Sequence, residues 1–568
     1  MNTSTNKVRI AILGGGPSGL FMFKRVVETN NPDFEITIFE RKDQLGAGMP
    51  YSTEGASDEH ITNVSDNEVP NFVSSIEEWT KQAPKPLLDR YQINPQNFNE
   101  YKVLPRLFFG AYLQSQFELL LKKAVAQNMS VTVKTGCNVD DVIYKDELNE
   151  VWVLAEQSIF KFDKVVISTG HNWPKKYEGL VKGYYDSPYP PVKIALKLNH
   201  AVALKGSSLT AIDAIRTLAR HNGSFVKDDD GKMTYQLAEG SENFNIMMHS
   251  RNGLLPAVRF HLEDSRLKND SLLSIEDFDQ HRKENGGFIS LDFVFEKDFK
   301  EIFKEKDPSF YEQIKAMDVE TFVDAMMELR EKLPPFQLLK AEYAQAEKSI
   351  KRKESIYWKE MLAILSFSMN YPAKYFSAED MLRLQKKLMP LISIVIAFVP
   401  QSSCKELIAL HDAGVLEIVS VGNDSEIEIA DQGGIVYHYK DENGEPVAQS
   451  YQTFIDCVGQ PHLDFDKFIF DGLKSAGAIS PAKLAFKDER MGAEEMERNE
   501  KVEVLDEDVY FLNVSGITIN DNFQIVDEKG DANPHIFIMA VPYIGGFNPD
   551  YSGIDFSEEA SQRIIDQF

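Results

Sequence analysis

The chain has 568 residues, too many for one ordinary hydrophobic core, so we expect two or three domains. Its hydrophobic content of 43% and charged content of 26% are typical of a globular protein. The net charge of −27 repels phosphate backbones and anionic lipid, which argues against nucleic acid and membrane as partners.

The three cysteines, Cys137, Cys404 and Cys457, lie far apart in the sequence, and no C-x-x-C occurs. This spacing argues against a disulfide framework, a zinc ribbon and a dithiol redox centre, so no metal site is expected. The N-terminus lacks an apolar signal segment, and the most apolar later run, Leu388 to Val399, is too short to span a bilayer. We interpret Ile392 to Val399 as a buried strand and expect a cytoplasmic protein.

The segment from Val8 to Glu40 carries the strongest pattern in the chain. An apolar strand stops at the sequence GGGPSG (residues 14–19), a helical pattern follows, and a second apolar strand ends in Phe39-Glu40. This is a β-α-β unit with G-x-G-x-x-G and an acidic residue about twenty positions further on. The glycines permit a tight turn and close approach of a pyrophosphate, the helix N-terminus attracts the diphosphate, and Glu40 can accept hydrogen bonds from ribose hydroxyls.

Further elements follow in chain order. The segment from Leu45 to Phe72 is rich in Gly, Pro and Asn and predicts loops that shape a ligand crevice. A helix is predicted for Arg106 to Ala126, and strands for residues 131–134 and 151–154. Another buried strand, from Phe162, ends in the sequence STGH (residues 168–171), where a glycine lets the chain turn away beside a cofactor.

A second possible nucleotide-binding unit begins near residue 200. The strand Ala201 to Lys205 is followed by GSSLTA (residues 206–211) and a helix that runs through Arg220. Ser208 occupies the position where glycine normally allows the closest approach of a pyrophosphate. Arg251, just past the strand Phe244 to Met248, can pair with the 2′-phosphate of NADPH. The alternative is a Rossmann-like half that binds no nucleotide, with Arg251 as a surface charge.

These patterns predict interleaved domains. We assign residues 1–199 and 461–568 to an FAD-binding domain, 200–261 and 391–460 to an NAD(P)-binding domain, and 262–390 to a helical insertion. The insertion is charged and carries Met and aromatic residues at helical spacing. We expect it to pack over the cleft between the two nucleotide folds as a lid or substrate wall; the alternative is a dimerisation arm. The chain ends in a glycine-bearing loop and a helix predicted from about Ser557.

In these motifs the chain resembles the two-dinucleotide-fold FAD/NAD(P)-binding proteins that include the FAD-dependent urate hydroxylases and L-aspartate N-monooxygenases of bacteria. The matching pieces keep the family's order and are GGGPSG (14–19), GAGMPY (46–51), HITNV (60–64), LPRLFFGAYL (104–113), STGH (168–171), GSSLTAID (206–213) and SRNGLLP (250–256). The resemblance implies an α/β fold: an FAD-binding Rossmann-like domain, an interleaved NAD(P)-type Rossmann-like domain and the helical insertion. It implies FAD in the first and NADPH in the second. Ser208 and the segment around Gly545 depart from the family's pattern.

The candidate site residues fall into two groups. The polar candidates for catalysis are Asn63, Arg106 and His171, with Arg106 able to hold a substrate carboxylate through two hydrogen bonds. The alternatives are that Arg106 is a surface arginine and that His171 is a structural histidine. The candidates for cofactor binding are Gly14, Gly16, Pro17, Ser18, Gly19, Glu40, Arg41, Gly48, Tyr51, Val139, Thr169, Gly170, Gly206, Ser208, Thr210, Ser250, Arg251, Gly545 and Gly546.

The leading functional hypothesis is an FAD-dependent, NAD(P)H-linked monooxygenase. Reduced flavin would react with O₂, and the resulting peroxyflavin would hydroxylate a small nucleophilic substrate in a dry pocket. The alternatives are an O₂-independent flavin reductase or dehydrogenase, and a flavin-bound assembly or regulatory protein without turnover. The expected partners are the small-molecule substrate, O₂ and a second copy of the chain in a homo-oligomer.

Overall fold

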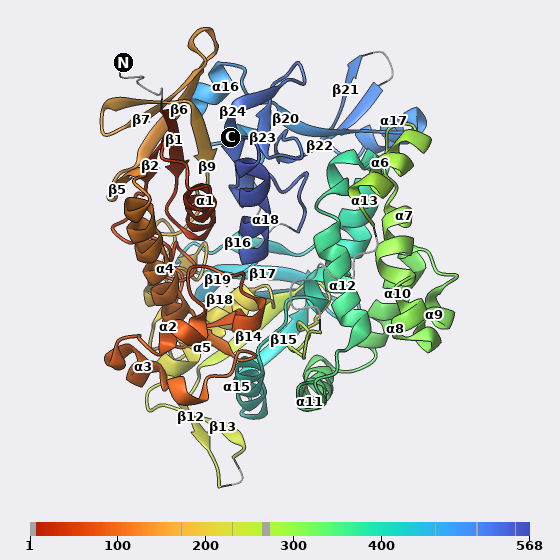
Figure 1. Ribbon diagram of the computed structural model, residues 1–568. Helices are drawn as coiled ribbons and strands as arrows, with labels where there is room; N and C mark the ends of the chain where they lie inside the picture. The colour runs from red at the N-terminus through yellow and green to blue at the C-terminus, as the bar shows by residue number, and fades with distance from the viewer. Residues whose placement is uncertain are drawn as a thin grey trace, which may run out of the picture.

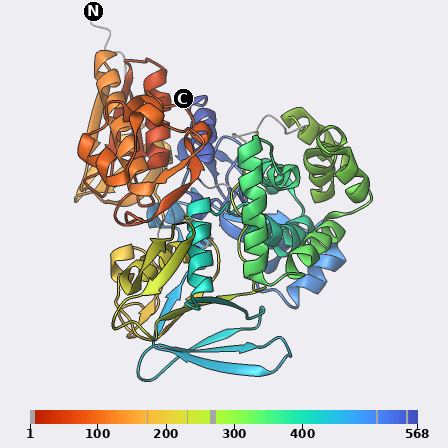
Figure 2. The ribbon, with the colours of Figure 1, turned by 90° about the horizontal axis from the view of Figure 1, so that it is seen from below.

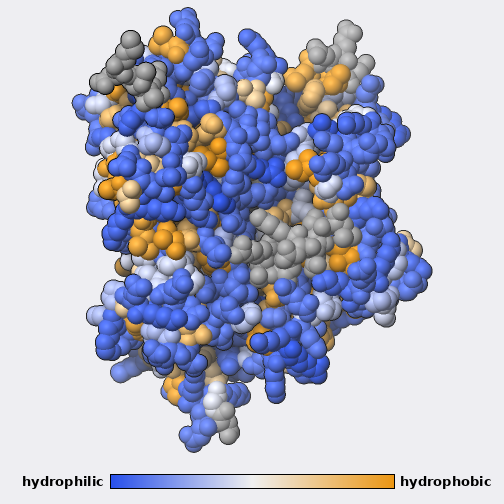
Figure 3. All heavy atoms as spheres, in the orientation of Figure 1, coloured by the Kyte–Doolittle hydropathy of each residue, from blue (hydrophilic) through white to orange (hydrophobic). Residues whose placement is uncertain are grey.

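The computed structural model describes residues 7–171, 173–229, 231–263, 273–460, 462–506, 509–550 and 553–568. Its three parts centre on two mainly parallel sheets and a group of helices (Figure 1). Seen from below, the first fold, the second fold and the helices lie around a C-terminal segment that reaches all three (Figure 2). The face shown in Figure 3 is mostly hydrophilic, as the large net charge predicts. None of the described helices is both long enough and apolar enough to cross a membrane.

The first fold is a six-stranded sheet in the order β23-β24-β9-β1-β2-β5. All neighbours are parallel except the pair β23–β24. The first strands, β1 (Val8–Leu13) and β2 (Phe34–Phe39), flank α1 (Pro17–Glu28) in sequence, as predicted. The other strands are β5 (Ser130–Lys134), β9 (Lys164–Ile167), β23 (Gln524–Val526) and β24 (Ala532–Ile538).

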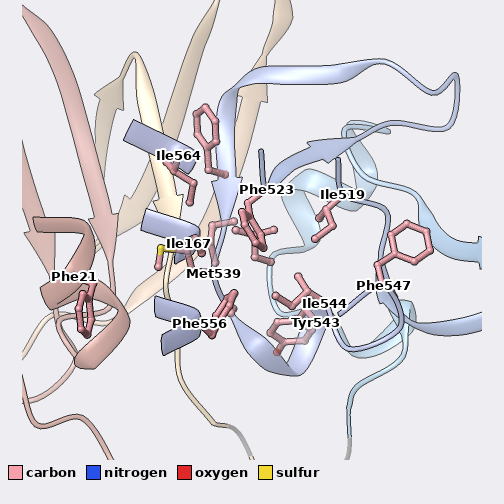
Figure 4. Packing of buried hydrophobic residues seen from close by; sticks show 14 of the residues in the cluster. Phe21, Ile167, Ile519, Phe523, Met539, Tyr543, Ile544, Phe547, Phe556 and Ile564 are labelled. Atoms are coloured by element: carbon pink, nitrogen blue, oxygen red, sulfur yellow. The ribbon is translucent and has the colours of Figure 1, made fainter. Parts of the chain in front are cut away.

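Smaller elements surround this sheet. α4 (Arg106–Ala126) has the predicted bounds, and α18 (Gly553–Ile565) packs beside α1. In the core, Phe523 just before β23 meets Phe556 of α18, with 5.8 Å between the ring centroids (Figure 4). The remaining elements are β3 (Ile61–Ser65), α2 (Ile76–Thr80), α3 (Lys85–Tyr91), β4 (Val103–Pro105), β6 (Val139–Lys145), β7 (Glu150–Ala155), β8 (Ser158–Phe162), α16 (Asp471–Ser475), β20 (Pro481–Ala485), α17 (Glu489–Met496), β21 (Val502–Asp506) and β22 (Val509–Ile517).

The second fold is a five-stranded, wholly parallel sheet in the order β10-β19-β11-β14-β15. Its first βα unit, β11 (Ala201–Lys205) and α5 (Leu209–Asn222), lies where the sequence predicts it. The sheet also includes β10 (Tyr184–Tyr185), which precedes the boundary placed at residue 200. The other elements are β12 (Gly223–Lys227), β13 (Met233–Leu237), β14 (Asn245–Ser250), α15 (Gln401–Asp412), β15 (Leu416–Ser420), β16 (Glu426–Ile429), β17 (Ile435–Lys440), β18 (Pro446–Tyr451) and β19 (Thr453–Asp456).

The insertion is helical, as its charge and periodicity predict. It contains α6 (Ile275–Glu284), α7 (Leu291–Phe295), α8 (Phe303–Lys306), α9 (Pro308–Ile314), α10 (Val319–Glu331), α11 (Pro335–Arg352), α12 (Tyr357–Ser368), α13 (Ala378–Arg383) and α14 (Met389–Val395). The prediction of a strand at Ile392 to Val399 is therefore wrong. Pro390 stands in the first turn of α14, directly after a π-helical turn at Leu384–Leu388, and Val399 makes only an isolated bridge to Val258.

The insertion shares hydrophobic core with both nucleotide folds. Phe295, Phe322 and Leu365 belong to the same buried cluster as the first sheet, whereas Phe336 and Leu339 on α11 belong to the cluster under the second sheet. The ring of Phe336 stacks on His411 of α15, with 3.8 Å between the centroids. Replacing the insertion with a short linker would therefore expose apolar surface on both folds.

A buried ion-pair network fixes three helices of the insertion to one another and to the second fold. Arg330 on α10 and Lys359 on α12 both donate to the Glu342 carboxylate on α11, each at 2.7 Å. Arg330 also donates to the backbone oxygen of Leu255, which packs in the second core. All three charged side chains are less than a tenth exposed. Glu342 thus neutralises two cations that have little access to water.

We expect Glu342→Gln to destabilise the protein by about 3–5 kcal/mol, because it leaves two buried cations without a counter-charge. The midpoint of urea unfolding, followed by the circular dichroism of the helices, measures the effect. Asp412→Asn, which breaks the exposed pair between Lys340 and Asp412, serves as the control and should cost less than about 1 kcal/mol. Equal midpoints for the two variants would show that the network contributes no more than a surface pair.

Candidate functional site

A hollow opens at the carboxyl edge of the first sheet, where the chain leaves four parallel strands. Its wall combines the turn after β1, the residues after β2 and β9, and the C-terminal segment. It is lined by Gly14, Gly16, Pro17, Ser18, Glu40, Arg41, Lys42, Gly48, Met49, Pro50, Tyr51, Ser168, Thr169, Gly170, His171, Met539, Val541, Pro542, Gly553, Ile554 and Ser557. Ligands of open α/β sheets bind at this edge.

The glycine turn is shaped by close backbone contacts. Gly14 has φ +110°, and a Cβ there would lie 2.5 Å from the Ser168 carbonyl oxygen. A Cβ on Gly19 would overlap the carbonyl oxygen of Gly14. Gly16 is the N-cap of α1, and no side chain caps that helix. The first N–H groups of α1 therefore remain available to a phosphate, as the sequence pattern requires.

Glu40 is held in place by the backbone. Its two carboxylate oxygens accept hydrogen bonds from the N–H groups of Gly15 at 2.7 Å and Lys42 at 2.9 Å, and the residue is 8% exposed. A carboxylate has about four acceptor positions, so acceptors remain for the hydroxyls of a ribose. Across the hollow, Thr169 Oγ1 is buried without a hydrogen-bond partner in the described part of the chain. A buried hydroxyl of this kind can donate a hydrogen bond to a polar ligand or a water molecule in the hollow.

A second helix also begins at the hollow. α18 starts at Gly553, and Gly553, Ile554 and Ser557 all belong to the lining. The hydroxyls of Ser557 and Ser18 lie 3.1 Å apart, so the N-terminal ends of α18 and α1 meet at this wall. The positive ends of two helix dipoles thus lie beside the same ligand space.

This part of the wall is not evident from the sequence, which predicts the start of the last helix near Ser557 and Gly545 and Gly546 as cofactor contacts. Neither glycine is in the lining: Gly545 packs against the ring of His462, and the N–H of Gly546 donates to Ser515 O at 2.8 Å. Gly553 just ahead of the amphipathic run from Ile554 is the signal that would have placed the helix correctly.

His171 is the one catalytic candidate that lines the hollow. Its Nδ1 lies against the side-chain oxygen of Gln460, and its ring centroid is 5.4 Å from that of Trp173. Burial lowers the pKa of His171 below its ordinary value, although the Gln460 contact acts in the opposite direction. The imidazole is therefore neutral near pH 7 and can carry a proton on one nitrogen only.

Arg106 does not line the hollow and lies at the interface between the two nucleotide folds. Its Nη1 donates to Asp213 Oδ2 on α5 at 2.6 Å, and its Nε donates to Ile61 O at 3.1 Å. The hydroxyl of Tyr189 donates to the same Asp213 oxygen at 2.6 Å. Burial opposes ionisation of Asp213, but Arg106 holds the pKa of that carboxyl below its usual range. The guanidinium is thus already paired with a carboxylate of this chain.

Asn63 and Val139 do not line the hollow either. Asn63 is exposed, and its backbone oxygen accepts from Arg259 of the segment after β14. Val139 is the first residue of β6 and pairs with Ala155. The structure therefore brings together the glycine turn, Glu40, Arg41, Gly48, Tyr51, Thr169, Gly170 and His171, and leaves Asn63, Arg106, Val139, Gly545 and Gly546 elsewhere.

The second fold has a similar turn after its strand β11, with fewer glycines than the turn after β1. Gly206 has φ +107°, and a Cβ there would lie 2.9 Å from Cys457 O. Ser208, the N-cap of α5, is exposed, and its side chain does not cap the helix. The first N–H groups of α5, which include that of Thr210, are thus free of a side-chain cap, as in α1.

Ser250 and Arg251 stand at the carboxyl end of β14, next to this turn. The Ser250 hydroxyl is buried, and neither it nor the exposed Arg251 guanidinium has a hydrogen-bond partner in the described part of the chain. A free guanidinium at this position suits the charge and shape of a phosphate.

Comparisons with known proteins agree with this arrangement. Residues 11–172 match the family described as FAD-NAD(P)-binding, and residues 274–396 match the family described as YdhS-like middle domain. The protein YdhS of Escherichia coli (strain K12) is 29% identical over 474 residues, which cover 82% of this chain and 86% of that protein.

Solved structures are similar over most of the chain but at low identity. The ornithine N-hydroxylase of Kutzneria sp. 744 has a TM-score of 0.46 and 11% identity, covering 99% of this chain and 98% of that one. The cadaverine monooxygenase DfoA of Erwinia amylovora has a TM-score of 0.44 and 10% identity, covering 98% and 93%. The glycine turn, Glu40 and the family match agree on one conclusion: residues 11–172 form an FAD-NAD(P)-binding domain.

Proposed function

We propose that the protein is an FAD-dependent oxidoreductase that accepts hydride from NADPH and acts as a monooxygenase on a small nucleophilic substrate. The observation that carries the proposal is the hollow itself, where a glycine turn, an uncapped helix N-terminus and the Glu40 carboxylate meet at one sheet edge. The second, weaker glycine turn supplies a place for the nicotinamide nucleotide.

The residues present fit FAD. The N–H groups at the start of α1 would hold the diphosphate, and Glu40 would accept from the ribose. The hydroxyl of Thr169 has no partner within the described chain and would bond to the ligand. When bound, the flavin supplies the redox chemistry, and the protein supplies placement and exclusion of water. His171, neutral and beside the hollow, is in position to hold or pass a proton at one ring nitrogen.

A direct assay tests the proposal. The purified protein should show a flavin absorption spectrum, release FAD on denaturation and oxidise NADPH with uptake of O₂ when a nucleophilic substrate is present. Turnover that persists without O₂ when an artificial electron acceptor is added would favour a reductase or dehydrogenase instead. A flavin-bound protein that never oxidises NADPH would favour a non-catalytic role, for which Ser208 in the second turn is the motivating observation.

Gly16→Val should abolish FAD binding. A Cβ at Gly16 already lies 3.3 Å from Gly48 Cα, and the two further methyl groups of valine would fill the space that the diphosphate needs. Flavin content after purification, measured by absorbance, checks the result. The matched control is Ser208→Val at the equivalent position of the second fold, which should leave the flavin content unchanged. A yellow Gly16→Val protein would contradict the site.

Arg251→Ala should weaken the binding of NADPH about ten- to a hundredfold, the range expected for one charge-assisted hydrogen bond. NADH lacks the 2′-phosphate, so its affinity serves as the internal control and should change little. Dissociation constants from fluorescence titration of the two nucleotides provide the comparison. Equal losses for both would show that Arg251 does not read the phosphate.

Ser208→Gly should preserve or improve the affinity for both nucleotides, because it removes a side chain from the turn that approaches the pyrophosphate. The same fluorescence titration measures the change. A large loss of affinity would mean that the Ser208 hydroxyl itself contacts the nucleotide.

A further inference from the structure

The helix α4 packs directly on one wall of the flavin hollow. A Cβ on Gly110, near the start of α4, would overlap the backbone oxygen of Tyr51, which lines the hollow. A Cβ on Gly46, in the same loop as Tyr51, would lie 2.6 Å from the backbone oxygen of Leu113 on α4. Backbone meets backbone at both contacts, so no side chain can adjust the distance between α4 and this wall.

The same helix begins at the second nucleotide fold. Its first residue, Arg106, donates through Nη1 to Asp213 Oδ2 on α5 at 2.6 Å. The Nε of Arg106 donates to Ile61 O at 3.1 Å, and its backbone N–H donates to His60 O at 2.9 Å. Arg106 is thus held by backbone oxygens of its own fold while its charge contacts the second fold.

A second set of contacts holds the same face of α5. Burial lowers the pKa of His60, and its Nδ1 accepts from the N–H of Ser57 at 3.1 Å, so the single ring proton is on Nε2. This Nε2 lies 3.1 Å from both Asp213 O and Thr217 Oγ1. The Thr217 hydroxyl donates to the Glu59 carboxylate at 2.6 Å. The first fold therefore contacts α5 at two residues that are four positions, and so about one turn, apart.

These contacts converge on Asp213. Its carboxylate accepts from Arg106 and from the Tyr189 hydroxyl, each at 2.6 Å, and its side chain is only 6% exposed. Asp213 lies four residues beyond Leu209, where α5 begins at the second glycine turn. Four residues of helix span about 6 Å along the axis, so a shift of Asp213 moves this turn with it.

Hydride transfer between two bound nucleotides depends on a narrow range of distance. In that step a hydride passes with its electron pair from the nicotinamide, which is oxidised, to the flavin, which is reduced. The reacting atoms must lie about 3–3.5 Å apart, and a displacement of about 1 Å can cost about a hundredfold in rate. Because the proposed function places the two nucleotides on different folds, this distance depends on how the folds are held together.

We propose that Asp213 is a positioning residue for hydride transfer: through Arg106 and α4, it fixes the second glycine turn relative to the flavin hollow. The inference rests on the proposed function. It assigns Arg106, a candidate for substrate binding on sequence grounds, to the alignment of the two folds. Asp213 lies outside the lining of the hollow and beyond the first turn of α5, so its loss should slow the transfer without weakening the binding of FAD or NADPH.

The test is stopped-flow absorbance of the FAD-loaded protein mixed with saturating NADPH in the absence of O₂. Asp213→Asn should lower the rate constant of flavin reduction about ten- to a hundredfold and leave the dissociation constants of FAD and NADPH unchanged.

The matched control is Asp521→Asn. Asp521 also pairs with a buried cation, Lys374 at 2.7 Å, and accepts from a tyrosine hydroxyl, Tyr375 at 2.8 Å, but it joins the insertion to the C-terminal segment. Both variants should lower the midpoint of urea unfolding, because each leaves a buried cation without its counter-charge. Only Asp213→Asn should slow the reduction.

Spin labels provide a readout that does not depend on turnover. The three natural cysteines are buried, so labels can be directed to Lys122→Cys on α4 and Gln236→Cys on β13, at exposed positions on the two folds. Pulsed electron paramagnetic resonance of the FAD-loaded protein should give one narrow distance distribution. This distribution should stay narrow with Asp521→Asn and broaden with Asp213→Asn.

The outcomes separate this inference from the function it rests on. A wild-type protein that holds no flavin, or holds flavin that NADPH does not reduce, overturns the proposed function and the inference with it. Where NADPH does reduce the flavin, three results overturn the inference alone: Asp213→Asn is reduced as fast as Asp521→Asn, its distance distribution stays narrow, or its NADPH affinity falls as much as its rate.

A second variant decides the question if Asp213→Asn does not fold. Arg106→Lys keeps the positive charge but lacks the forked donors that hold Asp213 and Ile61 O together. Slower flavin reduction with unchanged dissociation constants supports the inference, and reduction at the wild-type rate overturns it.

Discussion

The flavin site depends on backbone contacts that only glycine allows. α1 can begin directly beyond β1 because Gly14 and Gly19 have no Cβ atoms to separate helix, turn and strand. The close packing brings the N-terminus of α1 to the edge of the sheet, next to Glu40 and the turn after β9. The other elements that line the hollow, including the start of α18, lie next to this turn.

Buried ion pairs, both between and within the parts of the molecule, are a second constraint on its geometry. Arg106 and Asp213 join the first fold to the second, Arg216 and Glu406 join α5 to α15, and Glu342 joins three helices of the insertion. Each pair is expensive to separate, because opening would strand an ion in an apolar environment. The parts are thus positioned by specific pairings as well as by apolar contact, and the geometry of the ligand sites depends on them.

Local patterns predicted most of the fold correctly. β1, α1, β11 and α4 lie where the sequence places them, because hydrophobic period and glycine position determine such elements within a short stretch of chain. The strand expected at Ile392 is a helix, because an apolar run of that length suits either structure and its surroundings in the fold decide between them.

The limits of prediction are clearest in the site. Glu40 and the glycine turn line the hollow and belong to one sequence motif, and Thr169 belongs to the strand end STGH, so local sequence indicates all three. The contribution of α18 was missed because residues hundreds of positions apart meet there, and one sequence contains no record of that contact. The position of Arg106 could not be predicted for the same reason. Its motif is visible in the sequence, but its partner Asp213 lies on the other nucleotide fold. The hydrogen bond from Asn548 to the backbone oxygen of Asn370 could not be predicted either, since it joins the residues after α12 to a loop near the C-terminus.

The order of strands in the first sheet has a consequence for how the protein is made. β9 is synthesised long before β24, its partner in the sheet, and α18 is synthesised later still. Until then β9 presents an unpaired apolar edge, which is a site for mispairing and aggregation. The first fold therefore remains incomplete while the second fold and the insertion are synthesised. Closing it requires contacts of very long sequence separation, which form slowly. Free FAD in the cell would favour the completed state by binding only to it, so cofactor supply is expected to govern the yield of folded protein.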